Sequence, residues 1–289
     1  MKLKNQLFEF DKEMAEKWEQ GTENGSFSSQ ITVHSSQKPS SLFTSHSSPT
    51  LIIGTDEAGR GPGAGGVFAS AVYFHSLNNE LIEKLSCLND SKKLSKKKRE
   101  ELFEIISQTT IHSTVCIEVA EIERINILNA SLKAMKLACE KVIALCPPLE
   151  GTLPNEEILN VSLHERSKSI DFEGGLEQNN NILVLVDGNK LIKQFDHPQQ
   201  FIIKGDGKSA SIAAASILAK VTRDRYMEEL HEKFPQYNWM KNAGYLTKEH
   251  LQAIDKHGMT PIHRKTFLRK HFERIEQLKS GENNAIQIN

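Results

Sequence analysis

The sequence has few cysteines, and none of them are paired at a metal-binding spacing. Its four cysteines, Cys87, Cys116, Cys139 and Cys146, form no C-x-x-C pair. Zinc sites usually show such a spacing, so a zinc site is disfavoured here. We interpret the four side chains as small hydrophobic core residues of a protein in a reducing compartment.

Long apolar segments are also missing. The longest uncharged, fairly apolar stretch, Ser209–Ala219, has 11 residues, whereas a membrane-spanning helix needs about 20. Residues 1–10 are positively charged but have no apolar segment before Asp11 and Lys12, so no signal peptide is visible. We therefore expect a cytoplasmic protein without a membrane partner.

A net charge of one sign is the third absence. Lys and Arg total 36 and Asp and Glu total 37, which gives a net charge of −1, so the overall charge does not indicate a nucleic-acid partner. Basic residues are nevertheless concentrated in two segments, 92–99 and 263–274. Each can be a solvated helix face or a surface that contacts phosphates, and charge alone leaves both interpretations open.

Composition divides the chain into distinct regions. Residues 1–20 have the pattern of a short amphipathic helix, and residues 21–50 contain ten serines and two prolines, which indicates a flexible linker. We expect the folded domain to span residues 51–275. Within it, residues 149–181 are polar and aperiodic, which is typical of a surface insertion. We expect residues 276–289 to form a disordered tail.

The apolar pattern within the domain predicts an α/β fold. Strand patterns occur at residues 51–56, 67–74, 111–119, 182–186 and 200–203. Helical patterns occur at residues 96–107 after a Ser95 cap, 121–145, 210–233 after a Ser209 cap, and from Thr247 to near Gly258. This order fits a mixed five-stranded sheet flanked by helices, with a C-terminal helical part.

Carboxylates follow two of the predicted strands. Asp56 and Glu57 end the first strand and Asp187 ends the fourth. A buried carboxylate is costly unless it is paired or binds a metal, although an ordinary turn explains each position equally well when it is considered alone. Adjacent strand residues point to opposite faces, so Asp56 and Glu57 can face one metal only if the chain bends there, as Gly59 and Gly61 permit.

Asp224 lies within the predicted helix 210–233. Considered alone, it is best explained as an exposed helix residue that pairs with Arg223 or Arg225. Together with the three strand-end acids it completes an oxygen-only set, which favours hard cations such as Mg²⁺ and Mn²⁺. Two such ions can support hydrolysis of a phosphodiester.

The glycine-rich segment allows one competing interpretation. Gly61, Gly63 and Gly66 fit the G-x-G-x-x-G pattern of dinucleotide-binding proteins. That motif needs a helix that opens in the loop, whereas residues 67–74 have a strand pattern. A nucleotide-dependent oxidoreductase is therefore disfavoured.

Several motifs together resemble ribonuclease HII, the type 2 ribonuclease H. They are Asp-Glu-Ala-Gly-Arg-Gly-Pro (56–62), Leu-Asn-Asp-Ser-Lys-Lys-Leu-Ser (88–95), Val-Asp-Gly (186–188), Lys-Gly-Asp (204–206), Ile-Ala-Ala-Ala-Ser-Ile-Leu-Ala-Lys-Val-Thr-Arg-Asp-Arg (212–225), Gly-Tyr-Leu-Thr (244–247) and His-Arg-Lys-Thr-Phe (263–267). The resemblance covers roughly residues 51–270 in order, and the polar insertion interrupts it.

The resemblance implies an RNase H-like fold and a set of site residues. Its metal-binding and catalytic carboxylates fall on Asp56, Glu57, Asp187 and Asp224, which would hold Mn²⁺ or Mg²⁺, two ions during catalysis. Its substrate-binding residues fall on Gly59, Arg60, Gly61 and Tyr245, which would read the 2′-hydroxyl of a ribonucleotide joined to DNA and so select the RNA–DNA junction. The similar type 3 enzymes have a Gly-Lys-Gly loop and a glutamate as the fourth acid, so Arg60 and Asp224 favour type 2.

The activity implied by the resemblance is that of a metal-dependent endonuclease, acting as a monomer. It would hydrolyse the RNA strand of RNA–DNA hybrids and nick on the 5′ side of ribonucleotides embedded in duplex DNA, leaving 5′-phosphate and 3′-hydroxyl ends. Such an enzyme would remove misincorporated ribonucleotides and RNA primers. A non-catalytic nucleic-acid-binding protein on the same fold is the alternative, but clustered acids would weaken phosphate binding.

Overall fold

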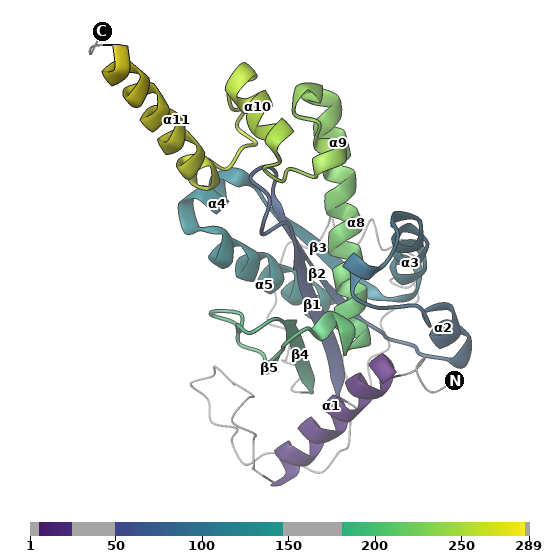
Figure 1. Cartoon of the computed structure of the whole chain (residues 1–289). Coiled ribbons are helices and arrows are strands. Elements are labelled where there is room, and N and C mark those ends of the chain that lie inside the picture. Colours follow the sequence, from purple (N-terminus) through teal and green to yellow (C-terminus); the bar gives the residue numbers. More distant parts are fainter. Residues whose placement is uncertain (1–5, 25–49, 147–180, 287–289) are drawn as a thin grey trace.

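The computed structural model describes residues 6–24, 50–146 and 181–286, which are built around one mixed sheet (Figure 1). The strands are β1 (Leu51–Ala58), β2 (Val67–Tyr73), β3 (Ile111–Ile117), β4 (Ile182–Asp187) and β5 (Gln199–Ile202). Their order across the sheet is β3-β2-β1-β4-β5. The predicted α/β fold with a five-stranded sheet is confirmed.

The direction of β1 and β4 positions the strand-end acids. β1 pairs antiparallel with β2 and parallel with β4, with Thr55 opposite Val186. Because parallel neighbours end at the same edge of a sheet, Asp56 and Asp187 lie beside each other at the carboxyl ends of the two central strands.

Two long helices cover the two faces of the sheet, α5 (Ile127–Leu145) and α8 (Ala210–Lys233). Alternate residues of β1 face them: Ile53 belongs to the core cluster that includes the apolar side of α5, and its neighbour Gly54 faces α8. A Cβ atom on Gly54 would lie 2.2 Å from the carbonyl carbon of Ser211. Helix α8 therefore packs directly on the backbone of the strand that carries Asp56.

The remaining helices lie around these layers. They are α1 (Gln6–Asn24), α2 (Asn79–Lys84), α3 (Lys96–Thr109), α4 (Val119–Ile125), α9 (Trp239–Asn242), α10 (Lys248–His257) and α11 (Lys265–Ile286). The predicted caps Ser95 and Ser209 each accept a hydrogen bond from a backbone N–H in the first turn of α3 and α8. Thr247 caps α10 in the same way.

One predicted helix is divided in two. The single helix predicted over residues 121–145 is wrong, because α4 ends and α5 begins at Asn126. Asn126 has φ +66°, and its side chain accepts a hydrogen bond from the N–H of Asn129. Asparagine tolerates positive φ and caps helices well, so this residue can end one helix and start the next.

Helix α1 is part of the folded core. Met14 and Trp18 pack in one cluster with Leu183 and Leu185 of β4, and α1 lies against the β4 side of the sheet in Figure 1. The sequence predicted that the folded domain begins at residue 51. This is wrong, because α1 already belongs to the folded core. The prediction treated the segment alone and had no sign of the apolar β4 face that it covers.

Two of the predicted segments lie largely outside the residues that the structure describes. Helix α1 extends to residue 24, into the linker expected over 21–50, and residues 25–49 lie outside the described part. The insertion expected over 149–181 also lies outside it, apart from Asn181.

Helix α11 continues to Ile286 and projects from the body of the molecule (Figure 1). The disordered tail expected from residue 276 is therefore wrong as far as that helix extends, because Glu, Gln, Leu and Lys are good helix formers. No helix among the described residues is long and apolar enough to cross a membrane.

Candidate active site at the carboxyl ends of β1 and β4

Asp56 is a carboxyl group in a buried position. Its side chain is 6% exposed, and its Oδ1 accepts a hydrogen bond from the N–H of Glu57 at 2.7 Å. Burial raises the pKa of Asp56 well above its usual value, and the nearby carboxylates of Glu57 and Asp187 raise it further. A hydrogen bond from Ser216 of α8 opposes this shift. The charged form of Asp56 is thus poorly compensated by the protein itself.

Glu57 lies beside the glycine-rich loop. Its Oε1 is 3.1 Å from Nη1 of Arg60. Burial raises the pKa of Glu57 and Arg60 lowers it, while the charge of Asp187 raises it again; the net shift is upward. The bend predicted at Asp56 and Glu57 is absent, because the ladder with β2 continues through Ala58. The chain turns one residue later, at Gly59, where φ is +99°.

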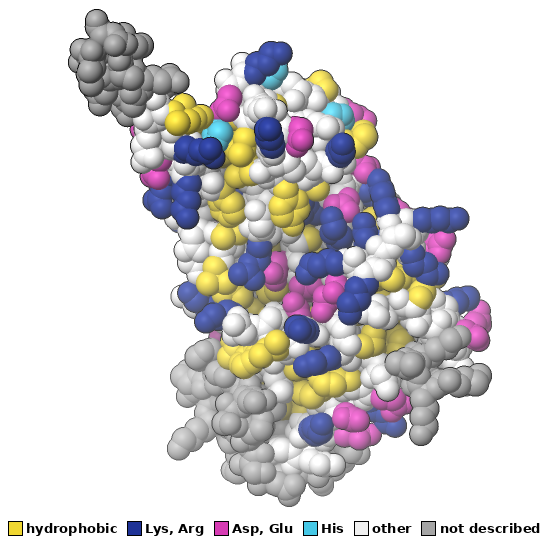
Figure 2. Space-filling model, in the orientation of Figure 1, with side chains coloured by type: hydrophobic (Ala, Val, Ile, Leu, Met, Phe, Trp, Pro, Cys, Tyr) yellow, Lys and Arg dark blue, Asp and Glu magenta, His cyan; other side chains and the backbone are white. Residues whose placement is uncertain are grey.

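Asp187 ends β4 and lies at a cavity of about 710 Å³. Its Oδ1 accepts a hydrogen bond from the N–H of Gly205 at 2.6 Å. Burial raises the pKa of the neighbouring Asp206, and the charges of Asp187 and Asp90 raise it further. The cavity is also lined by four lysines, Lys92, Lys93, Lys204 and Lys208. In Figure 2, acidic side chains are gathered in the middle of the visible face, with Lys and Arg side chains around them.

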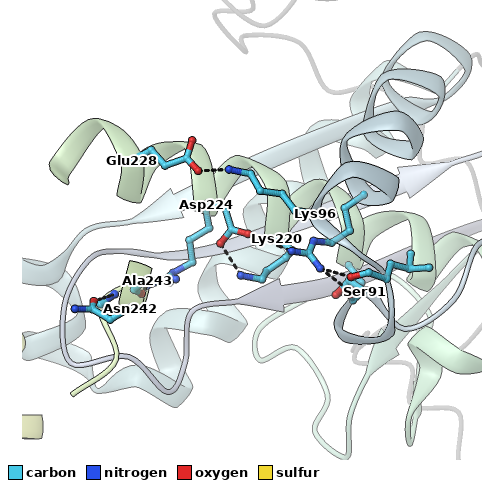
Figure 3. A network of polar contacts seen from close by, with 12 residues as sticks. Ser91, Lys96, Lys220, Asp224, Glu228, Asn242 and Ala243 are labelled. Carbon is cyan, nitrogen blue, oxygen red and sulfur yellow. Dashed lines mark hydrogen bonds and ion pairs between the residues drawn. The ribbon is translucent and has the colours of Figure 1, made fainter. Parts of the chain in front are cut away.

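Asp224 is held by two cations, of which Lys220 is labelled beside it in Figure 3. Lys220 Nζ lies 2.5 Å from its Oδ1, and Arg99 Nη2 lies 3.9 Å from its Oδ2. The alternative pairing with Arg223 or Arg225 is wrong, because Arg225 pairs with Glu100 and Arg223 turns into the protein. On α8, Asp224 comes eight residues after the Ser216 that contacts Asp56, a rise of about 12 Å.

The structure brings three of the four predicted acids into mutual electrostatic contact. The charge of Asp187 raises the pKa of both Asp56 and Glu57, and the charge of Glu57 also raises the pKa of Asp56. As the side chains stand, residues 6–24, 50–146 and 181–286 contain no three carboxylate, histidine or cysteine groups placed to hold one ion. The donor chemistry fits a hard cation, since only oxygen atoms are offered. Binding would require the side chains to turn towards the ion.

A buried arginine holds the predicted substrate loop from inside. Arg264 is fully buried, and its guanidinium donates to the carbonyl oxygens of Gly59 at 2.8 Å and Arg60 at 3.3 Å. It also donates to Gly65 at 2.7 and 2.9 Å and to Gly66 at 3.2 Å. The loop is therefore fixed at both of its ends by one side chain.

A second buried arginine joins this loop to the segment that carries Tyr245. Arg223 is 2% exposed and donates to the carbonyl oxygens of Ala64 at 3.2 Å and Ala243 at 3.1 Å. A Cβ atom on Gly59 would lie 2.2 Å from Nε of Arg223. The loop needs glycine there both for its positive φ and for this close approach.

Tyr245 meets the Gly-Arg-Gly loop directly. Its side chain is 53% exposed, and a Cβ atom on Gly61 would lie 3.2 Å from its Cε1 atom. The adjacent backbone segments are also joined, since the N–H of Gly63 donates to the carbonyl of Gly244 at 2.9 Å. All the predicted substrate-binding residues therefore belong to one continuous surface beside Glu57.

Sequence reasoning missed the structural role of several residues that shape this site. Arg223 and Arg264 fix the loop, Lys220 and Arg99 hold Asp224, and Asp206 adds a carboxyl group beside Asp187. All of these except Arg99 lie within the motifs quoted above. Arg223 stands among other charged residues, Asp224 and Arg225, so nothing in its local sequence indicated that it is buried.

Comparison with known proteins agrees with the motifs. The family model described as Ribonuclease HII matches residues 53–150 and 163–275. A curated Ribonuclease HII of Rickettsia canadensis is 44% identical over 217 residues, which cover 75% of this chain and 89% of that protein. Another, from Fusobacterium nucleatum, is 43% identical over 227 residues, which cover 78% of this chain and 89% of that protein.

Two solved structures have a similar fold. Ribonuclease H2 from Pyrococcus horikoshii is 23% identical with a TM-score of 0.52, and the match covers 78% of this chain and 99% of that one. A chain of the PCNA:RNase HII complex from Archaeoglobus fulgidus is 22% identical with a TM-score of 0.51, covering 74% of this chain and 93% of that one. At this identity the likeness concerns the fold alone, and it confirms the predicted RNase H-like sheet.

Proposed function

The chain belongs to the ribonuclease HII family and is therefore an endonuclease of the hydrolase class, and from this premise we propose its substrate and products. It hydrolyses the RNA strand of RNA–DNA hybrids and nicks on the 5′ side of single ribonucleotides in duplex DNA. The ends are a 5′-phosphate and a 3′-hydroxyl. Its cellular task is to remove misincorporated ribonucleotides and RNA primers.

The observation that carries this proposal is the adjacency of two groups of residues. The acids Asp56, Glu57 and Asp187 lie at one sheet edge, and the Arg60–Glu57 ion pair connects them to the Gly61–Tyr245 contact. A ribonucleotide read at that contact would have its phosphodiester next to the acids. The 2′-hydroxyl is the group that separates RNA from DNA, and the backbone amides of a glycine loop can approach it closely.

The proposed cofactor is a pair of Mn²⁺ or Mg²⁺ ions held by Asp56, Glu57, Asp187 and Asp224. Support comes from the raised pKa of Asp56, since a cation would compensate a carboxylate that burial and its neighbours destabilise. When bound, two divalent ions activate a water molecule and stabilise the leaving oxygen. In our assignment Asp56, Glu57 and Asp187 would hold the ions, and Asp224 would help to hold the second ion or orient the attacking water.

Residues of the chain itself bind and orient the duplex. Lys92, Lys93, Lys204 and Lys208 surround the cavity at Asp187 and would contact phosphates. Arg60 and Tyr245 would contact the ribonucleotide, and their orientation depends on the buried guanidinium groups of Arg264 and Arg223. The cation that Lys220 provides would hold Asp224 in place until the ions bind.

A single assay tests the proposal. A labelled DNA duplex with one ribonucleotide is incubated with Mg²⁺ or Mn²⁺, with and without a chelator, and the position and ends of the nick are mapped. We expect one metal-dependent nick on the 5′ side of the ribonucleotide. Asp56→Asn should abolish it and keep the circular dichroism of the parent, whereas Asp196→Asn, at an exposed carboxylate away from the acids, should cleave normally. Cleavage in chelator, or near-normal cleavage by Asp56→Asn, would refute the assignment.

The proposed working state is a cytoplasmic monomer. Both the location and the oligomeric state stay predictions. Light scattering after size exclusion, with and without a hybrid duplex, measures the oligomeric state directly, and a mass of about twice the 32.5 kDa of one chain would contradict it.

A further inference from the structure

Two buried histidines form a polar chain that ends on the backbone of Tyr245. His250 of α10 is fully buried and His263 is 2% exposed. Their Nε2 atoms are 3.1 Å apart, and His250 Nδ1 lies 2.9 Å from the carbonyl oxygen of Tyr245. The Nε1–H group of Trp239 donates to His250 Nε2 at 3.0 Å.

The surrounding donors fix the tautomer of each ring. The backbone N–H of Thr260 donates to His263 Nδ1 at 2.9 Å, so that nitrogen carries no proton. His263 therefore has its proton on Nε2 and donates it to His250. His250 Nε2 accepts from both His263 and Trp239, so its proton is on Nδ1, where it donates to Tyr245.

Only neutral rings satisfy this arrangement. A second proton on His250 would face the N–H groups of Trp239 and His263, and a second proton on His263 would face the N–H of Thr260. Burial lowers the pKa of His250, and burial together with His250 lowers the pKa of His263 to about 4. Both rings are therefore neutral at pH 7, and the direction of every hydrogen bond in the chain is defined.

The same segment also holds the other half of the proposed recognition surface. His263 is followed by Arg264, which binds the carbonyl oxygens of Gly59 and Arg60. His263 reaches Tyr245 through His250, while its own backbone forms an isolated β-bridge with Ala64. Two consecutive residues thus set the spacing between Tyr245 and the Gly-Arg-Gly loop.

We propose that His250 is a positioning residue for ribonucleotide recognition, because its Nδ1–H group holds the carbonyl of Tyr245 so that the ring lies against Gly61, while His263 sets the tautomer of His250. The inference rests on the proposed function, in which Tyr245 reads the ribonucleotide. The half-exposed ring of Tyr245 receives limited packing, so its backbone contacts determine where it points. They are few: the N–H donates to Asn242 at 2.8 Å, and the carbonyl accepts from Thr247 at 2.8 Å and from His250.

Two substitutions of His250 separate positioning from packing. Asparagine is short and can keep the donor to Tyr245 in the place of Nδ1, but it loses the acceptor for Trp239 and His263. Glutamine is longer and can keep that acceptor in the place of Nε2, but it loses the donor to Tyr245. Both remove the ring, neither introduces a charge, and each keeps one of the two polar positions of His250.

The measurement is kcat/KM on two substrates, a duplex with one embedded ribonucleotide and a continuous RNA–DNA hybrid. In the proposed function Tyr245 reads a ribonucleotide joined to DNA, which only the first substrate presents at the cleaved bond. We expect His250→Gln to lower the ratio of kcat/KM on the single-ribonucleotide duplex to kcat/KM on the hybrid roughly tenfold, because small displacements of a contacting group have large kinetic effects. His250→Asn should stay within about threefold of the parent ratio. In a Tyr245→Phe background, neither substitution should change the ratio further, since coupled residues are not additive.

Other outcomes would overturn the inference. Equal loss on both substrates for His250→Gln, or the same ratio for both variants, would make the histidines ordinary core residues. His112→Gln, at a partly buried histidine of β3 that the Tyr245 chain does not include, controls for general destabilisation and should leave the ratio unchanged. If His250→Gln does not fold, Trp239→Phe keeps the donor to Tyr245 and should keep the ratio; a tenfold loss there would also contradict us.

A second readout needs no activity. Nitrogen NMR of ¹⁵N-histidine-labelled parent protein at pH 7 should show His250 protonated on Nδ1 and His263 on Nε2. Other tautomers would overturn the positioning chain even if the enzyme is active. Absence of a metal-dependent nick by the parent, with these tautomers present, would instead overturn the proposed function, so the two failures are distinguishable.

Discussion

The ring of Tyr245 lies against the backbone of Gly61, so closely that a Cβ atom on Gly61 would be 3.2 Å from Cε1 of the ring. Gly61 does not have the positive φ of Gly59 or Gly65. The lack of a side chain at position 61 therefore allows the close approach of the ring. The backbone of Gly61 itself has a conformation that other residues can adopt. This makes the contact accessible to a small substitution that leaves the fold intact.

Gly61→Ala should reduce recognition of a single ribonucleotide without unfolding the protein. The added methyl group would displace the half-exposed ring of Tyr245, and we expect kcat/KM on a single-ribonucleotide duplex to fall roughly tenfold. The melting temperature should change by less than about 3 °C. The same substitution in a Tyr245→Ala background should have little further effect, because the ring that it displaces is gone. A tenfold loss in both backgrounds would show that the contact is not the cause.

Arg264→Lys should be strongly destabilising despite conserving the charge. Lysine cannot reach the carbonyl oxygens of Gly59, Arg60, Gly65 and Gly66 together, and buried acceptors without a donor are costly. We expect the free energy of unfolding, measured by urea denaturation, to fall by about 2 to 4 kcal/mol.

Arg225→Lys is the matched control for that variant. Arg225 is exposed and pairs with Glu100 on the surface, and such pairs contribute about 0 to 1 kcal/mol. A loss for Arg264→Lys that is no larger than that of Arg225→Lys would contradict the role of Arg264 as the buried clamp of the loop.

The parts of the fold that the sequence predicted depend on neighbouring residues along the chain. The strand that carries Asp56 and the cap at Ser209 are local features, because alternation, apolar runs and capping side chains act over a few residues. Asp56 and Asp187 were both predicted at strand ends, and parallel pairing of the two strands brings them together. Their shared edge was therefore foreseeable, although the family resemblance was needed to add Asp224.

The parts that the sequence did not predict depend on distant partners. Helix α1 is explained by the β4 face that it covers, and Arg264 by carbonyl groups about 200 positions away in the chain. The histidine chain joins α10 to the segment before α11. Local propensity contains no information on such contacts. The missing bend at Glu57 has the same origin, because pairing with β2 keeps the strand straight for one residue longer.

Asp11 should give the protein a measurable pH dependence. This residue of α1 accepts a hydrogen bond from the N–H of Ser211 at the start of α8. Burial raises its pKa from 3.8 to about 6, against hydrogen bonds from Ser209 and Ser211 that lower it. The folded state therefore binds the proton more tightly than the unfolded state does. The free energy of unfolding should decrease as the pH rises from about 4 to about 6, and should be constant in this respect above that range.

Asp11→Asn removes this titration. The unfolding free energy of the parent minus that of Asp11→Asn should fall by roughly 1 to 3 kcal/mol as the pH rises from 4 to 7. Urea denaturation at several pH values measures it. A difference that is flat over this range, or one that rises with pH, would show that the carboxyl group is not held in the buried position at the start of α8.

Removing the charge of Asp56 should stabilise the metal-free protein while it prevents stabilisation by metal. In the absence of a cation, burial and the charges of Glu57 and Asp187 disfavour the ionised form of Asp56. Asparagine keeps an oxygen that can accept from the N–H of Glu57 but carries no charge. In chelator, Asp56→Asn should therefore melt at a higher temperature than the parent.

Adding Mn²⁺ should reverse that order. A ligand at 100 times its dissociation constant stabilises the folded state by about 2.7 kcal/mol, so the parent should gain several degrees, whereas Asp56→Asn should gain little. Asp224→Asn is the control, because Lys220 and Arg99 already compensate its charge. It should not melt higher than the parent in chelator. If Asp56→Asn melts below the parent in chelator, or gains as much from Mn²⁺, then Asp56 is not the uncompensated carboxylate that a metal ion would neutralise.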